Sequence, residues 1–260
     1  MTRFIAVLSG KGGVGKTTVA INLADAFNKL GKDVVVLDGN LTSPDIGLDL
    51  GLAEVPVSFH DVIKNKNTIL NSIYLHSSGI RVIPGSINLE AIKDIDLTSL
   101  ERIFKQLRGL SEIIIIDLQA GLGTETLSVL KFVDEVLIVT NPDITSVANA
   151  LKGVKLADEM NITVLGVVLN KVKGDALELS SSSVETLLER PILTTVNESD
   201  EIREARLKKQ TIFSNSPSSP AVANFKKLAA YLIGETYQEK LELPKKNSLF
   251  QSIKEKFGLK

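Results

Sequence analysis

The sequence predicts an α/β fold, with a mainly parallel β-sheet covered by helices on both faces. Short runs rich in Val and Ile alternate along the chain with longer segments whose apolar residues recur at helical spacing. This alternation is typical of βαβ units. The apolar runs are continuous, as expected of strands that are buried on both faces. The expected strands are residues 4–8, 34–37, 80–83, 113–116, 136–139, 164–169 and 192–195.

Helical segments fill most of the intervals between these strands. The first helix follows the first strand and should end at Gly31, because a glycine readily adopts the left-handed conformation beyond the last turn. Residues 41–79 are less periodic and contain two prolines, so we expect a helical insertion over the carboxyl ends of the strands. The Ser180–Ser183 run is a loop, or a helix start capped by Ser183. Further helices are expected over residues 98–107, 146–160 and 200–208.

Composition limits the classes of function. A chain of 260 residues with 43% hydrophobic residues can bury a sizeable single core. The net charge of −1 gives the whole chain no electrostatic reason to bind nucleic acid. The absence of cysteine excludes disulfides, thiolate metal sites and iron–sulfur ligation. No signal-peptide pattern is present, and no apolar run approaches the ~18 residues of a membrane span, which favours a cytoplasmic protein.

A phosphate-binding loop directly follows the first strand and matches the pattern G-x-x-x-x-G-K-[ST]. Its glycines let successive backbone N–H groups point at a triphosphate, and the following helix adds the positive end of its dipole. Lys16 should neutralise the β- and γ-phosphates, and the Thr17 hydroxyl should bind Mg²⁺. Lys11 is an additional cation close to the γ-phosphate. The expected phosphate-binding residues are Gly10, Lys11, Gly12, Gly13, Val14, Gly15, Lys16, Thr17 and Thr18.

Two carboxylates end neighbouring apolar runs. Asp38 follows the second strand, and Asp117 follows four isoleucines. Beside a phosphate loop, such a carboxylate holds Mg²⁺ or a water bound to it, although Asp117 could also be a turn or capping residue. The segment after Asp117 resembles a switch loop, in which the backbone N–H of Gly121 could approach the γ-phosphate.

Together, the phosphate loop with Lys11, the strand end at Asp38, the Asp-x-x-Ala-Gly turn at Asp117 and the later Leu169-Asn170-Lys171 resemble the MinD/ParA family of deviant Walker A ATPases. The layout most resembles the MinD branch, from the first strand to about Tyr231. The resemblance implies a single P-loop NTPase domain over residues 1–237 that binds ATP with Mg²⁺ and hydrolyses it to ADP and phosphate. It also implies an ATP-dependent homodimer.

The same resemblance assigns roles to individual residues. Lys11 would reach the phosphates of the partner subunit, and Asn170 would bind adenine, because an amide donates to and accepts from one base edge at once. Lys171 adjoins Asn170, and Asn197 and Glu198 lie where the family closes over the base. The family commonly has proline in place of Asn197, so the resemblance is weaker there.

Asn40 departs from the family pattern. Members with good turnover place a second aspartate two positions after the one that matches Asp38, where it aligns the attacking water. An asparagine can hydrogen-bond a water but cannot accept its proton. Because phosphoryl transfer depends mostly on positioning and electrostatics, the sequence predicts slow hydrolysis rather than none.

The C-terminal segment is predicted to be a linker over residues 238–246 and an amphipathic helix over residues 247–260. Ser248 and Gln251 have capping-box spacing. The segment could dock on the protein's own core, or it could lie on the cytoplasmic face of the cell membrane and bind anionic lipids. Its predicted membrane-facing residues are Leu249, Phe250, Ile253 and Phe257.

The sequence therefore favours a MinD-like ATPase that binds membrane reversibly and positions an unknown protein partner in cell division or polar machinery. One alternative is a ParA-like ATPase that binds DNA through a basic face, which the near-zero net charge disfavours. Another is a scaffold that binds ATP and scarcely hydrolyses it, which Asn40 favours. An iron–sulfur carrier is excluded by the lack of cysteine.

Overall fold

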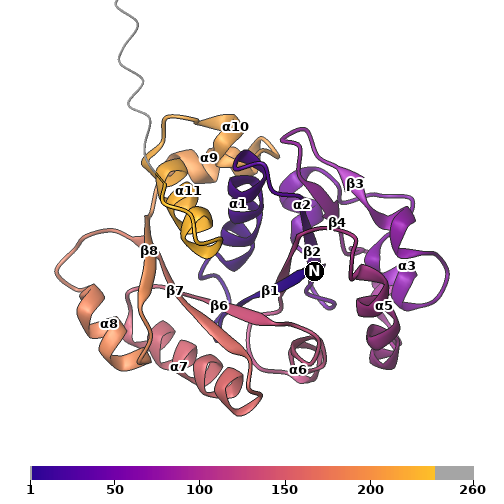
Figure 1. Cartoon of the computed structure of the whole chain (residues 1–260), viewed down its shortest axis with the longest axis horizontal. Coiled ribbons are helices and arrows are strands. Elements are labelled where there is room, and N and C mark those ends of the chain that lie inside the picture. The colour runs from indigo at the N-terminus through magenta and orange to yellow at the C-terminus, as the bar shows by residue number, and fades with distance from the viewer. Residues whose placement is uncertain (1, 238–260) are drawn as a thin grey trace, which may run out of the picture.

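An eight-stranded sheet forms the centre of the structure, a computed structural model that describes residues 2–237 (Figure 1). The strand order is β3-β4-β2-β5-β1-β6-β7-β8, and every pairing is parallel except that of β3 with β4 at one edge. The strands are β1 (Arg3–Leu8), β2 (Val34–Gly39), β3 (Tyr74–Leu75), β4 (Arg81–Ile83), β5 (Ile113–Leu118), β6 (Glu135–Thr140), β7 (Thr163–Val172) and β8 (Ile192–Asn197).

The predicted α/β fold is confirmed, and each predicted strand is present with its ends displaced by at most a few residues. The antiparallel strand β3 was not predicted, because two residues are too few to produce a hydrophobic pattern. The predicted linker and amphipathic helix, residues 238–260, lie outside the described residues. Within residues 2–237, no helix is long and apolar enough to cross a membrane.

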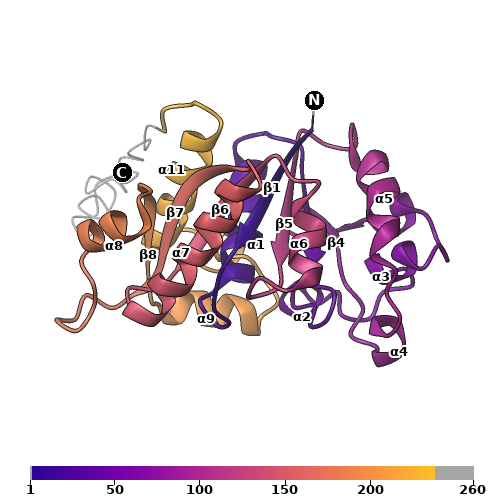
Figure 2. The ribbon, with the colours of Figure 1, turned by 90° about the horizontal axis from the view of Figure 1, so that it is seen from below.

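Helices cover both faces of the sheet. Figure 1 shows α1 and α11 on one side and α6, α7 and α8 on the other, and in Figure 2 α6 and α7 lie in front of the strands while α1 lies behind them. The first side comprises α1 (Lys16–Lys29), α2 (Ile46–Leu50), α9 (Asp200–Leu207), α10 (Ile212–Asn215) and α11 (Pro220–Leu232). The second comprises α3 (Phe59–Ile63), α5 (Leu100–Leu107), α6 (Thr124–Leu130), α7 (Ile144–Glu159) and α8 (Ser181–Leu188).

The less periodic insertion contains short helices, α2, α3 and the 3-10 helix η1 (Ile69–Ser72); α4 (Leu89–Ile92) and the 3-10 helix η2 (Leu97–Ser99) follow it. The serine run begins α8, so the helix-start alternative is confirmed, but Ser183 is not its cap. Ser180 is the N-cap, and its hydroxyl accepts the backbone N–H of Ser183 at 3.1 Å.

The sheet positions the site through its central strands. β1 lies between β5 and β6, and β2 lies on the other side of β5. Parallel pairing places Asp38 of β2 opposite Asp117 of β5, with Val7 of β1 opposite Asp117 on the other side. The loop that leaves β1 therefore lies beside both carboxylates, at the edge where open α/β sheets bind ligands.

Candidate nucleotide-binding site

The loop between β1 and α1 has the backbone of a phosphate cradle. Gly13 and Gly15 have φ angles of 79° and 92°, in the left-handed region that favours glycine, and Gly15 is the N-cap of α1. The N–H groups of the first turn of a helix have no partner within the helix and carry the positive end of its dipole. Thr17 and Thr18 lie in this first turn and are partly exposed, so an anion above the loop can reach them.

Neighbouring segments approach this loop so closely that they leave no room for a side chain. A Cβ atom at Gly10 would lie 2.1 Å from the backbone oxygen of Asn149 on α7. A Cβ atom at Gly15 would lie 2.2 Å from the side-chain amide nitrogen of Asn170 on β7. Glycine at these two positions is therefore required by tertiary packing as well as by the turn.

Two side chains from β7 bind the backbone of the loop. The amide nitrogen of Asn170, a residue with 4% of its surface exposed, donates to the carbonyl of Val14 at 2.7 Å. The Lys171 ammonium donates to the carbonyl of Gly13 at 2.6 Å. Both residues were predicted at the site as nucleotide contacts, whereas in this structure they hold the loop itself. A contact between Asn170 and adenine stays a prediction.

The loop lysine forms a buried ion pair with the carboxylate from β5. The Lys16 ammonium lies 2.7 Å from Asp117 Oδ1, and the two side chains are 6% and 0% exposed. Within the described residues, Asp117 Oδ2 is buried without a hydrogen-bond partner. Buried carboxylate oxygens are rarely left without a partner, and a divalent cation with its bound water would supply one.

Asp38 lies in the same buried cluster. Its oxygens accept the backbone N–H groups of Asn40 at 3.2 Å and of Ile46 at 3.0 Å. Burial, and next the negative charge of Asp117, raise the pKa of Asp38 well above its usual value, although these two hydrogen bonds and Lys16 act in the opposite direction. The cluster thus combines two carboxylates with one lysine, and its charge is balanced when Asp38 holds a proton or a cation is nearby.

The Asn40 side chain is occupied in a local turn. Its oxygen accepts the backbone N–H of Ser43 at 3.1 Å, and its nitrogen donates to the Ser43 carbonyl. An aspartate at this position could form only the first of these two bonds. Asn40, which was predicted to be catalytic, therefore stabilises the loop after β2 in this structure, and 6% of its surface is exposed.

Lys11 lies at the rim of the loop, and 45% of its side chain is exposed. Its ammonium is 3.7 Å from a carboxylate oxygen of Asp143, the residue that caps α7 by accepting the N–H of Ser146. The backbone N–H of Gly121 donates to the carbonyl of Ser9 at 3.0 Å, so an approach of this group to a phosphate requires that bond to open.

Asn197 and Glu198 lie at the end of β8, next to two cavities. Residues 197–201 and 219–221 contribute to one cavity of about 410 Å³. Asn141, Lys171 and Glu198 contribute to another of about 300 Å³. The Glu198 carboxylate lies 3.4 Å from the Lys173 ammonium. Asn197 and Glu198, which were predicted to lie over the nucleotide base, are thus beside open space near Asn170 and Lys171.

Sequence reasoning missed two acidic residues of this region. Asp143 faces Lys11, and its position at a helix start three residues after a strand was the available signal. Asp45 precedes α2, and burial, followed by the charge of Asp117, raises the pKa of Asp45. Only the folding of the insertion over the strand ends brings Asp45 toward the site, so spacing alone could not reveal it.

A P-loop nucleotide-binding protein is the class that this fold and loop define. A family model described as "ParA: NUBPL iron-transfer P-loop NTPase" matches residues 1–233. The chain belongs to this ParA/MinD family of P-loop NTPases. Because the sequence contains no cysteine, it lacks the thiolate ligands that the iron transfer named in this description would use.

Individual relatives agree with this assignment. The chain is 37% identical, over 98% of its length and 96% of the relative, to an uncharacterized ATP-binding protein of Methanocaldococcus jannaschii. Its structure is similar to that of the septum site-determining protein MinD of Pyrococcus horikoshii in complex with Mg-ADP, with a TM-score of 0.85, 30% identity and coverage of 89% and 96% of the two chains. The cell division ATPase MinD of Pyrococcus furiosus gives a TM-score of 0.86 at 31% identity, covering 90% of this chain and 99% of that one.

The hydrogen bond from Asn170 to the phosphate loop leads to a test. In Asn170→Asp, a carboxylate faces the Val14 carbonyl and cannot donate to it, so the free energy of unfolding should fall by about 1–3 kcal/mol. Nucleotide affinity should fall about tenfold or more, because the loop loses its support. Urea denaturation and nucleotide titration measure the two effects.

The matched control is Asn28→Asp. Asn28 donates to the Ser78 carbonyl at 3.3 Å, and it lies near the opposite end of α1 from the phosphate loop. This substitution should leave nucleotide affinity unchanged. Equal affinities for the two variants would show that Asn170 does not support the loop.

Proposed function

We propose that this chain is a MinD-like ATPase that dimerises on ATP, binds the membrane reversibly and positions a protein partner, with slow hydrolysis. The observation that carries the proposal is the difference in burial between the two lysines of the loop. Lys16 is buried against Asp117, whereas Lys11 extends from the rim with nearly half of its side chain exposed. An exposed cation at this place is available to phosphates that a second subunit presents.

The residues of the cluster fit a nucleotide with Mg²⁺. Asp117 Oδ2, which has no hydrogen-bond partner among the described residues, and the buried carboxylate of Asp38 are acceptors suited to a hard cation or to water bound to it. The Thr17 hydroxyl lies in the first turn of the adjacent helix α1. Bound Mg²⁺ would neutralise charge on the phosphates. Lys16 supplies the positive charge at the base of the loop, and the loop glycines supply N–H donors.

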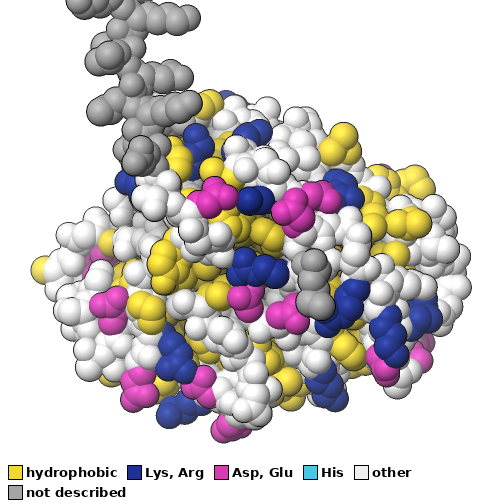
Figure 3. All heavy atoms as spheres, viewed as in Figure 1, with side chains coloured by type: hydrophobic (Ala, Val, Ile, Leu, Met, Phe, Trp, Pro, Cys, Tyr) yellow, Lys and Arg dark blue, Asp and Glu magenta, His cyan; other side chains and the backbone are white. Residues whose placement is uncertain are grey.

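Slow hydrolysis is supported by the position of Asn40. Its amide is bonded to Ser43 through both polar atoms, so it neither offers a base nor points freely toward a water. The same contacts favour a second candidate function, an ATP-binding scaffold with little hydrolysis. A DNA-partition role lacks comparable support, since Lys and Arg are interspersed with Asp and Glu on the face shown in Figure 3.

Replacing Asn40 by aspartate should raise the hydrolysis rate. The introduced carboxylate keeps the bond from the Ser43 N–H but loses the bond to the Ser43 carbonyl, so its second oxygen is free to accept a proton from water. We expect wild-type turnover below about 1 s⁻¹ and an increase of about ten- to hundredfold in Asn40→Asp. Phosphate release at saturating Mg-ATP measures both, and Asn40→Ala, which has no base, is the control. A fast wild-type enzyme would contradict the proposal.

Binding of Mg-nucleotide should release protons. The raised pKa of Asp38 means that the folded protein binds this proton more tightly than the unfolded chain does, so the stability from Asp38 is present at low pH and declines as pH rises through the raised pKa. A cation near Asp38 favours its ionised form, so nucleotide affinity should fall as pH is lowered through that range.

Calorimetry in buffers of different ionisation enthalpy measures the released protons. Asp38→Asn should abolish this component, whereas Asp158→Asn, at a site on the far end of α7, should retain it. Proton release that is unchanged in Asp38→Asn would assign the effect to another group.

Membrane binding is tested by a chain that ends at Lys246. Sedimentation with vesicles that contain phosphatidylglycerol should require ATP and should be lost on truncation, because each large apolar side chain contributes roughly 1.5–3 kcal/mol when it leaves water. Two linked tails on one dimer would strengthen the weak binding of one. Within the full chain, Phe250→Ser with Ile253→Ser should act like the truncation, and Gln251→Ala should not. ATP-dependent binding by the truncated chain would contradict the tail's role.

A further inference from the structure

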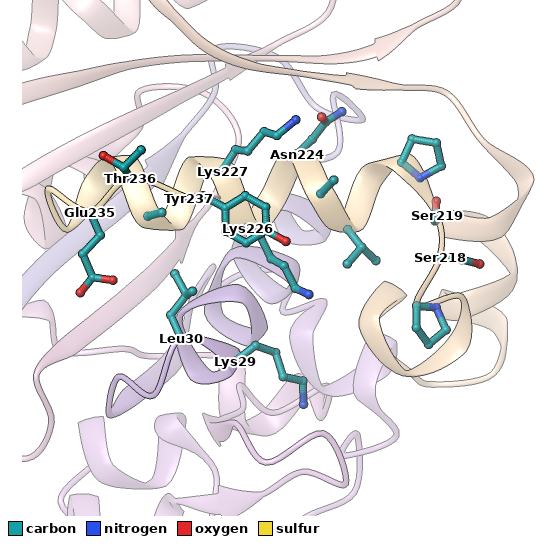
Figure 4. A pocket seen from close by; sticks show the side chains of 15 residues that line it. Lys29, Leu30, Ser218, Ser219, Asn224, Lys226, Lys227, Glu235, Thr236 and Tyr237 are labelled. Carbon is teal, nitrogen blue, oxygen red and sulfur yellow. The ribbon is translucent and has the colours of Figure 1, made fainter. Parts of the chain in front are cut away.

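A large cavity lies away from the phosphate loop, between the C-terminal end of α1 and α11 (Figure 4). We call it the α1–α11 pocket, and its volume is about 1160 Å³. Its lining consists of Lys29 and Leu30 of α1 and of residues 217–220, 222–224, 226, 227, 230 and 235–237. None of the residues assigned to nucleotide binding lines this pocket. It therefore needs its own explanation.

The polar part of the pocket is cationic. Lys29, Lys226 and Lys227 line it, and Figure 4 shows the ammonium ends of Lys29 and Lys226 pointing toward the same side. Within residues 2–237, no carboxylate lies within salt-bridge distance of Lys226 or Lys227. The lining carboxylate, Glu235, is engaged with Lys32 at 3.1 Å.

The Lys29 ammonium already has two partners within the protein. Its ammonium donates to the Ser78 carbonyl at 3.0 Å and lies 3.4 Å from the buried carboxylate of Asp25. This anchoring holds a positive charge at one wall, and Lys226 of α11 points toward the same side, whereas the Lys227 ammonium points away from both in Figure 4. The pocket therefore presents positive charge from two elements to one ligand.

The remaining wall is apolar. Leu30, Val222 and Ala230 line it, and Tyr237 is the aromatic side chain that the described residues contribute. Free phosphate would make no use of this wall, and one aromatic ring offers little stacking for bases. A ligand that combines an anionic group with an apolar body matches both parts, which is the chemistry of an anionic phospholipid.

The location of the pocket supports the same ligand. Residues 235–237 belong to its lining, and the segment that carries the proposed membrane-binding residues begins at residue 238. The twelve residues that follow Tyr237, up to Leu249, span at most about 43 Å, so the pocket is within reach of a membrane that this segment binds.

We propose that the α1–α11 pocket binds the phosphate headgroup of an anionic membrane lipid, as a second membrane contact beside the C-terminal segment. This inference rests on the membrane-binding part of the proposed function. It assigns Lys29 and Lys226 to the phosphate and Leu30, Val222 and Tyr237 to the apolar part of the lipid. The folded domain then contributes to the choice of lipid together with the C-terminal segment.

The vesicle test compares two double variants of the full chain. Lys226→Gln with Lys227→Gln removes two of the three lysine charges of the pocket, and Lys152→Gln with Lys155→Gln removes the same charge from α7 on the other side of the sheet. Affinity for vesicles containing phosphatidylglycerol should fall by about fivefold per lysine in the pocket variant only. The salt dependence of vesicle binding should also weaken in the pocket variant, and the rate of ATP hydrolysis should be unchanged in both double variants.

A second test does not depend on the tail or on a bilayer. Dihexanoyl phosphatidylglycerol below its critical micelle concentration should shift the amide NMR signals of Ser218, Ser219 and residues 226–227, and the pocket variant should lose the shift. Inorganic phosphate at equal concentration should give a much smaller shift. Equal shifts for the two would overturn lipid recognition in favour of general anion binding.

The outcomes separate this inference from the proposed function. A full chain that binds no vesicles contradicts the proposed membrane function, and the soluble lipid still decides whether the pocket recognises the headgroup. If the full chain binds vesicles, two results together overturn the pocket inference: equal vesicle binding by the two double variants, and no NMR shift from the soluble lipid. The proposed membrane binding by the C-terminal segment is unaffected by these results.

Discussion

The buried ion pair between Lys16 and Asp117 is the interaction on which the site depends. Its ammonium and carboxylate lie 2.7 Å apart with almost no exposure to water, and removal of either partner from such a pair costs about 3–5 kcal/mol. Asp38 lies opposite Asp117 in the sheet register, so one lysine faces two carboxylates. Burial, and next the charge of Asp117, raise the pKa of Asp38, and Asp117 Oδ2 has no hydrogen-bond partner among the described residues. The cluster is thereby suited to a group that brings positive charge.

A second constraint is the close contact between β7 and the phosphate loop. Asn170 and Lys171 hold the carbonyls of Val14 and Gly13, and their approach leaves no space for a side chain at Gly15. The loop is therefore shaped by the neighbouring strand as well as by its own glycines. Any ligand that changes the position of β7 or its following loop acts directly on the phosphate-binding backbone.

The turn after β2 links the site to the insertion. Asn40 bonds to Ser43, and Asp38 accepts the N–H of Ile46 at the start of α2. Thr42 in this turn also donates to Glu125 of α6 at 2.7 Å, so the loops that follow β2 and β5 are in direct contact. These contacts hold the loop after β2 in place beside the carboxylate cluster.

The sequence by itself determined the alternation of strands and helices, the phosphate loop and the carboxylates at two strand ends, because these features are local patterns of hydrophobicity and spacing. Tertiary structure decided the partners: Lys16 with Asp117, Lys11 with Asp143, Asn170 with Val14, and the three lysines of the α1–α11 pocket. These partners are far apart in the chain, and only the order of strands in the sheet brings them together. The short edge strand β3 also became known only from the fold, since its two residues are stabilised by pairing with β4 and show no sequence period. The cap of α8 is a local contact, but a run of four serines did not show which of them begins the helix.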